Sequence, residues 1–159
     1  MILRLCGSFL LLLASSIVSM MLSRVGKRRL LSLQEVINLL KYIRNNISSF
    51  KTPLDGIFNN YRSDLFDSVG FSDAMKSEGL CAAFSRSYLD IPSEVETHLI
   101  EFSCSLGTGY ADDEIKRCDY YVSVIQEIAE KERTRVEKSR ELYRFLPTLA
   151  ALSVIIILL

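Results

Sequence analysis

The chain has 159 residues, with 19 basic and 19 acidic side chains, 49% hydrophobic residues and no Trp. That length suits one modest domain, and a content of only 3 Pro and 7 Gly excludes a collagen-like or low-complexity chain. A formal net charge of zero argues against a nucleic-acid-binding protein, because such proteins neutralise phosphates with a basic face.

The charges are unevenly placed along the chain. Residues 1–23 carry only Arg4, and residues 145–159 carry no charged side chain. The 121 residues between them hold 18 of the bases and all 19 acids, a net charge of −1. An apolar end, a charged middle and an apolar end are typical of a membrane-anchored protein and exclude an ordinary soluble globule.

The N-terminal segment, residues 1–23, is predicted to be a transmembrane helix. Residues 5–23 hold no charge, and as a helix they would rise about 28 Å, close to the ~30 Å hydrocarbon core. The bases that follow outnumber Arg4 on the other flank, so the positive-inside rule predicts that the middle of the chain faces the cytoplasm. These membrane-flanking bases are Arg24, Lys27, Arg28 and Arg29.

A cleaved signal peptide is the alternative for the same segment. Met1–Arg4 would be its n-region, residues 5–13 its h-region and Ala14-Ser15-Ser16 its cleavage site. The rest of the chain would then be an extracytoplasmic helical binding module. Four bases so soon after the cleavage site would be unusual in a translocated domain, so the anchored topology is favoured.

The C-terminal segment, residues 145–159, is predicted to be a second, short transmembrane helix. Its 15 residues would rise about 22 Å, but Leu142 and Tyr143 add apolar length, and Arg144 can snorkel to the membrane surface. A buried core helix is the alternative, which is weakened because no solvent-facing polar residue breaks the run. Both spans would lead into one cytoplasmic domain.

The middle of the chain, residues 24–144, is predicted to be a small all-α bundle of about five to six helices. Thr52-Pro53-Leu54-Asp55 predicts a helix start, and Gly70 and Gly79 predict an end and a break. Before them, apolar residues recur at helical spacing on one face: Leu33, Val36, Ile37, Leu40, Ile43 and Ile47.

Two longer helices are predicted after these. The sequence Ser93-Glu94-Val95-Glu96 predicts a capping box, and Gly107 predicts the end of that helix. Between them runs an apolar seam: Val95, Leu99, Phe102 and Leu106. The last helix is predicted to begin at Asp112 or Asp113. Its second half is mostly charged, which predicts an exposed stalk or a surface that packs on another protein.

No catalytic set is present in the sequence. His98 is the only histidine, and Cys81, Cys104 and Cys118 lack the spacing of a metal site. Three thiols in the middle leave one over after any disulfide, which agrees with a reducing cytoplasm. No phosphate-binding loop motif occurs, so this chain is not expected to hydrolyse ATP itself. We therefore expect no enzyme activity, no metal and no cofactor.

Charged side chains supply the candidate partner-binding positions. The acids at the start of the last helix are candidates for docking a basic partner surface, although the helix macrodipole also explains them. These acids are Asp112, Asp113 and Glu114, and the basic candidates are Arg62, Arg133, Lys138 and Arg140. Arg144 joins the membrane-flanking bases at the C-terminal end.

The order of these motifs resembles the stage III sporulation protein AB family over nearly the whole chain. The likeness rests on an N-terminal span with basic residues, Thr52-Pro53-Leu54 after a helix break, Leu106-Gly107 before a long helix, and residues 140–146 (Arg-Glu-Leu-Tyr-Arg-Phe-Leu). The family usually has Glu, Tyr, Asp and Gln where this chain has Asn46, Ser49, Tyr110 and Glu114. We therefore expect a divergent member.

The resemblance implies a non-enzymatic platform component of a secretion-like complex that joins mother cell and forespore during sporulation. Its soluble domain would be similar to the helical cytoplasmic domains of type II secretion platform proteins. The protein would lie in the mother-cell membrane around the forespore, with its domain in the cytoplasm. It would couple a secretion-type ATPase to the other membrane components of the complex. The resemblance is also compatible with a homo-oligomer.

Overall fold

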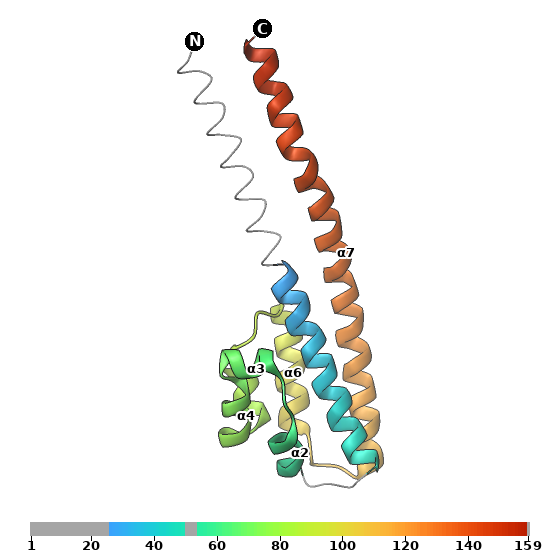
Figure 1. Ribbon diagram of the computed structural model, residues 1–159. Coiled ribbons are helices and arrows are strands. Elements are labelled where there is room, and N and C mark those ends of the chain that lie inside the picture. Colours follow the sequence, from blue (N-terminus) through green and yellow to red (C-terminus); the bar gives the residue numbers. More distant parts are fainter. Residues whose placement is uncertain (1–25, 50–53, 159) are drawn as a thin grey trace. The chain divides into compact units, whose positions relative to one another are not determined.

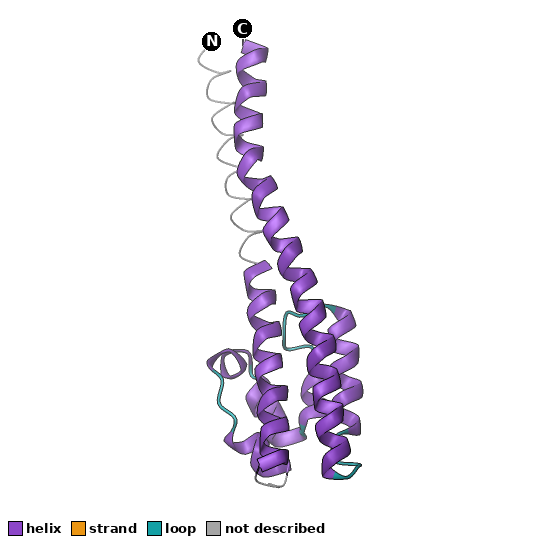
Figure 2. Ribbon diagram, turned by 90° about the vertical axis from the view of Figure 1, so that its right-hand side faces the viewer, coloured by secondary structure: helices purple, strands orange, loops and turns teal. Residues whose placement is uncertain are grey.

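A computed structural model describes residues 26–49 and 54–158, with the backbone alone for Asp55 and for 140–158. The described residues form helices and turns without a strand, which confirms the all-α class (Figure 1 and Figure 2). After the helix of residues 26–49 come α2 (Leu54–Asn60), α3 (Asp64–Val69), α4 (Phe71–Glu78), α5 (Leu80–Ser85), α6 (Ser93–Ser105) and α7 (Ala111–Leu158).

The chain divides into two compact units, residues 29–131 and residues 1–28 with 132–159. The first unit holds the hydrophobic core. In the second, a Cβ added to Gly26 would lie 2.9 Å from Val136 Cγ2, so glycine allows a close approach there.

The predicted N-terminal span, residues 1–23, lies outside the described residues. Residues 145–158 are the last part of α7, so the predicted long helix and the predicted C-terminal helix are one element. Within the part of the chain that the structure describes, no helix combines the length and the apolar character needed to cross a membrane.

The helix of residues 26–49 supplies one side of the core. All six residues predicted to share its apolar face are buried, and Leu39 is buried beside them. Arg44 on the same helix forms a two-pronged ion pair with Asp119 of α7, at 3.0 and 3.3 Å. The helical periodicity of the sequence therefore predicted the buried face of this element correctly.

The short helices α3, α4 and α5 are separated by glycines. Ser63 caps α3 by accepting a hydrogen bond from the Phe66 N–H, and Gly70 ends α3 in the left-handed conformation, with φ +78°. Gly79 separates α4 from α5. Both glycines lie where the sequence predicted an interruption. The predicted start of α2 is described only from Leu54, because Thr52 and Pro53 lie outside the described residues.

A row of five aromatic rings joins these helices. The rings of Tyr42, Tyr61, Phe66, Phe71 and Phe84 follow one another at centroid distances of 5.1, 5.9, 4.6 and 4.9 Å. Tilted ring pairs at such distances are favourable beyond the area that they bury. The Tyr61 hydroxyl also donates a 2.9 Å hydrogen bond to Glu35, and burial, helped by this bond, raises the pKa of Tyr61.

Helix α6 has the predicted seam but not the predicted capping box. Val95, Leu99 and Phe102 are fully buried, and Leu106 packs against the core. However, Pro92 is the N-cap of α6 and no side chain caps the helix, so the capping-box prediction is wrong. The reason is that Ser93 is the first residue of α6 and not its cap, and the Glu96 carboxylate accepts a hydrogen bond from the Ser87 hydroxyl.

The cysteines also correct a prediction. Cys81 of α5 and Cys104 of α6 form a disulfide, with their Cα atoms 5.2 Å apart, whereas Cys118 is free and buried. The sequence indicated reduced thiols because the three cysteines of the middle segment leave one over after any disulfide. The two partners are 23 residues apart, and only the packing of α5 on α6 brings them together.

Exchange of Phe66 for alanine should destabilise the domain by about 3–5 kcal/mol, because it removes the fully buried ring at the centre of the aromatic row. The matched control is Val69→Ala on the same helix, where the side chain is 38% exposed and the expected loss is below about 1 kcal/mol. Urea unfolding followed by circular dichroism measures both. Equal losses would contradict the proposed role of the ring.

Candidate functional site

The α6–α7 junction, residues 105–117, contains the predicted acidic docking residues. Between the two helices the chain turns at Gly107, which has φ +85°. A Cβ at this position would lie 2.7 Å from Leu54 Cδ1 of α2. Backbone conformation and close packing therefore both favour the glycine that the sequence predicted at the end of α6.

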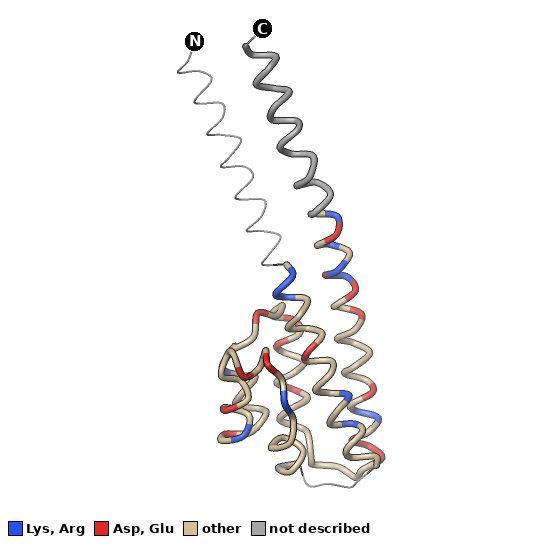
Figure 3. The backbone as a smooth tube through the Cα atoms, in the orientation of Figure 1, with Lys and Arg blue, Asp and Glu red and all other residues tan. Residues whose placement is uncertain are grey.

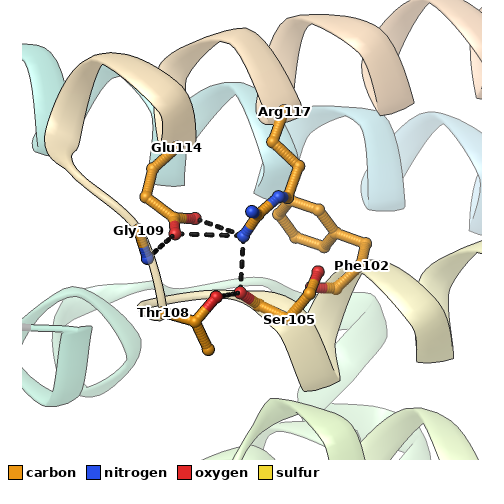
Figure 4. Close-up of polar contacts among 6 residues, drawn as sticks. All are labelled: Phe102, Ser105, Thr108, Gly109, Glu114 and Arg117. Atoms are coloured by element: carbon orange, nitrogen blue, oxygen red, sulfur yellow. Dashed lines mark hydrogen bonds and ion pairs between the residues drawn. The ribbon is translucent and has the colours of Figure 1, made fainter.

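A buried carboxylate closes this turn (Figure 4). Glu114 Oε1 accepts a 2.9 Å hydrogen bond from the Gly109 N–H, and Arg117 donates to both Glu114 oxygens at 3.0 and 3.2 Å. The Ser105 carbonyl at the end of α6 accepts hydrogen bonds from Arg117 and from the Thr108 hydroxyl. Because the Glu114 side chain is only 5% exposed, this network fixes the turn from inside the protein.

The three acids predicted as one docking cluster are thus divided by the fold. Asp112 and Asp113 are exposed, and Asp113 lies 4.0 Å from Lys116. Glu114 is committed to Gly109 and Arg117, so it shapes the surface without being part of it. All three lie in the first turn of α7, where negative charge also stabilises the helix dipole.

Two exposed tyrosines beside these acids were not singled out as binding residues from the sequence. Tyr110, in the turn, is 85% exposed and Tyr120, on α7, is 58% exposed. The exposed face of α7 has intervals of three and four residues: Asp113, Lys116, Tyr120, Ser123 and Glu127. Exposure of large aromatic rings is typical of protein-binding surfaces. For Tyr120, the signal that could have identified it is its outward-facing position on an amphipathic helix.

The charge around this surface has a small excess of acid. Residues 105–120 contain four acids and two bases, and one of these bases, Lys116, lies on the same face 4.0 Å from Asp113. Another group of bases lies at the N-terminal end of the helix of residues 26–49, as Figure 3 shows. Arg117 and Arg44 are each paired with an acid of α7. The surface of Tyr110, Asp112, Asp113 and Tyr120, called here the junction face, is therefore suited to a basic partner.

The remaining predicted residues lie on other segments and do not join this face. Arg62 is exposed between α2 and α3, and Lys27 and Arg28 are exposed. Arg29 pairs with Asp90 at 3.4 Å. Arg133 pairs with Glu137 at 3.1 Å, and Lys138 is exposed. Arg24 lies outside the described residues, and only the backbone is described for Arg140 and Arg144.

His98 and Cys118, which the sequence analysis considered for catalysis or metal binding, make contacts that belong to the fold. His98 packs edge-on against Tyr121, with ring centroids 6.3 Å apart, and its Nδ1 lies 4.0 Å from Glu101. Burial, and next the charge of Glu114, raise the pKa of Cys118 to about 12. Among the described residues, no group of three or more His, Cys, Asp or Glu side chains is placed to hold a metal ion.

Replacing Glu114 by glutamine should cost about 1–3 kcal/mol, because Arg117 loses its carboxylate partner inside the turn. Asp113→Asn, one residue earlier and exposed, should change the free energy of unfolding by less than about 0.5 kcal/mol. Denaturant melts of the two variants provide the comparison. If Asp113→Asn is the more damaging change, the assignment of Glu114 as the closing residue is wrong.

The raised pKa of Cys118 predicts a loss of stability at alkaline pH. Below a pH of about 9 the thiol is protonated in both the folded and the unfolded protein. Above that pH the unfolded protein releases the proton while the folded protein keeps it, which favours unfolding. From pH 9 to pH 10 the wild type should therefore lose about 1 kcal/mol more than Cys118→Ala. Parallel thermal melts at both pH values measure this difference, and identical pH slopes for the two proteins would refute it.

The chain belongs to the stage III sporulation protein AB family, whose family model matches residues 4–159. This match confirms the resemblance described from the sequence and assigns the protein a role in stage III of sporulation. No curated protein and no solved structure matches the chain.

Proposed function

We propose that this member of the stage III sporulation protein AB family is a non-enzymatic membrane platform. It couples a cytoplasmic secretion-type ATPase to the other membrane components of a complex that links mother cell and forespore. The protein lies in the mother-cell membrane around the forespore, and residues 24–144 face the cytoplasm.

The observation that carries this proposal is the separation of charge along the chain. The uncharged stretch of residues 5–23 is followed by four bases within residues 24–29. The uncharged C-terminal segment is preceded by residues 131–144, with six bases and three acids. Basic residues beside apolar segments favour the cytoplasmic, anionic side of a membrane. Exposure of Lys27 and Arg28 leaves both side chains available to lipid headgroups.

The junction face supports the second half of the proposal, contact with the ATPase. Its tyrosines supply apolar area that is exposed in the free protein, and its acids supply a field that attracts a basic surface. The buried Glu114 holds the turn in place before a partner arrives, which lowers the entropy lost on binding. The resemblance to secretion platforms makes the ATPase of the same complex the expected partner.

Charge reversal on the junction face should separate the protein from its ATPase. Asp112→Lys combined with Asp113→Lys should reduce co-purification with the cognate ATPase at least tenfold, because two attractive contacts become repulsive. The matched control is Asp67→Lys, an exposed acid of α3 outside the face, which should bind like the wild type. Quantified pull-downs from membranes of cells that make both proteins give the ratios. Failure of the wild type to bring down the ATPase would refute the coupling role itself.

The extracytoplasmic binding module is the second candidate, and the Cys81–Cys104 disulfide favours it. Stable disulfides are typical of oxidising compartments. The two topologies differ at the N-terminus of the mature protein. The membrane platform should retain residues 1–23, whereas a mature protein that begins after Ser16 would establish the secreted form. Mass spectrometry of the intact protein, purified through a C-terminal tag, distinguishes the two N-termini by their difference in mass.

A further inference from the structure

The disulfide joins two helices that the core already places side by side. Phe84 of α5 is buried in the row of rings, and Phe102 of α6 is buried in the same cluster. The Cα atoms of Cys81 and Cys104 are 5.2 Å apart, within the range that a disulfide spans. Because packing sets this separation, the two sulfur atoms remain neighbours when both are thiols.

The three cysteines of the described residues differ in accessibility. Cys104 occupies an exposed position of α6 and Cys81 a half-buried position of α5. Cys118 has no exposed surface, and burial raises the pKa of its thiol. Thiol–disulfide exchange needs an accessible thiolate, so a reagent in solution reaches Cys104 first and does not reach Cys118.

We propose that Cys81 and Cys104 are a reversible thiol–disulfide site for low-molecular-weight disulfides, with Cys104 as the entry thiol and Cys81 as the resolving thiol. The Cys104 thiolate attacks the small disulfide, forms a mixed disulfide and releases one thiolate. The Cys81 thiolate then attacks the Cys104 sulfur, which forms the Cys81–Cys104 bond and releases the second. Two protein thiols are oxidised, one disulfide is reduced to two thiols, and the two protons leave with these products.

The bond changes the connection between α5 and α6. It closes the segment between residues 81 and 104, which contains the turn at Ser87, a residue with φ +49°. Cross-linking a segment of this length reduces the freedom of the unfolded chain and stabilises the folded one. In a reducing cytoplasm both cysteines would be thiols. They would form the disulfide when an oxidant is present, as is usual for redox-sensing cysteine pairs there. The site is independent of the ATPase-coupling role.

The test uses the full chain in detergent, equilibrated with reduced and oxidised glutathione at several ratios. The remaining thiols are then alkylated, and peptides are mapped without reduction. We expect a single Cys81–Cys104 link that dithiothreitol reverses, with Cys118 alkylated only after unfolding. The oxidised wild type should melt about 10 °C above the reduced form, and Cys81→Ser should lack this shift.

The single-cysteine variants test the order of the two steps. Cys81→Ser should stop at a glutathione adduct on Cys104, because the resolving thiol is absent. Cys104→Ser should form less than one tenth as much adduct on Cys81. The proposal is overturned if both cysteines stay alkylatable at every glutathione ratio, if the link involves Cys118 or a second chain, or if the adduct forms equally on either cysteine. None of these outcomes depends on binding of the ATPase.

Discussion

Three consecutive helices of six to eight residues persist in this domain because they bury aromatic rings against one another. Helices this short are unstable alone, since each must fix a first turn for few hydrogen bonds. Contact among Phe66, Phe71 and Phe84 supplies what local propensity cannot, and Tyr61 extends the row to the helix of residues 26–49. The long helices thus have a common core to pack on, and the α6–α7 junction depends on it.

The junction shows how a fold and a recognition surface share residues. Glu114 and Arg117 form a polar pair within the turn: Glu114 accepts from the Gly109 N–H of the turn, and Arg117 donates to the Ser105 carbonyl at the end of α6. Their neighbours Asp112, Asp113 and Tyr110 are left to face the solvent. A rigid turn that exposes acids and an aromatic ring suits binding, because little conformational entropy is lost when a partner binds.

Periodic features of this protein could be predicted from the sequence, and features that depend on tertiary contact could not. The 3.6-residue pattern identified the buried face from Leu33 to Ile47, and Gly70, Gly79 and Gly107 marked helix ends because their backbone has left-handed or otherwise unusual angles. The capping box failed because Ser93 lies inside α6, with Pro92 as the cap, and Glu96 contacts Ser87 of another segment. Glu114 looked like its exposed neighbours, and Cys81 and Cys104 looked unrelated, since each role is set by a residue from another helix or turn.

The contact between Gly26 and Val136 has a consequence for how the chain responds to ionic strength. Many neighbours of Val136 are charged, and ion pairs such as Arg133 with Glu137 weaken as salt screens them. Exclusion of one atom by another is unaffected by salt, and the valine leaves no room for a side chain at position 26. A side chain at position 26 would therefore press against Val136 at every salt concentration, including those that screen the surrounding charges.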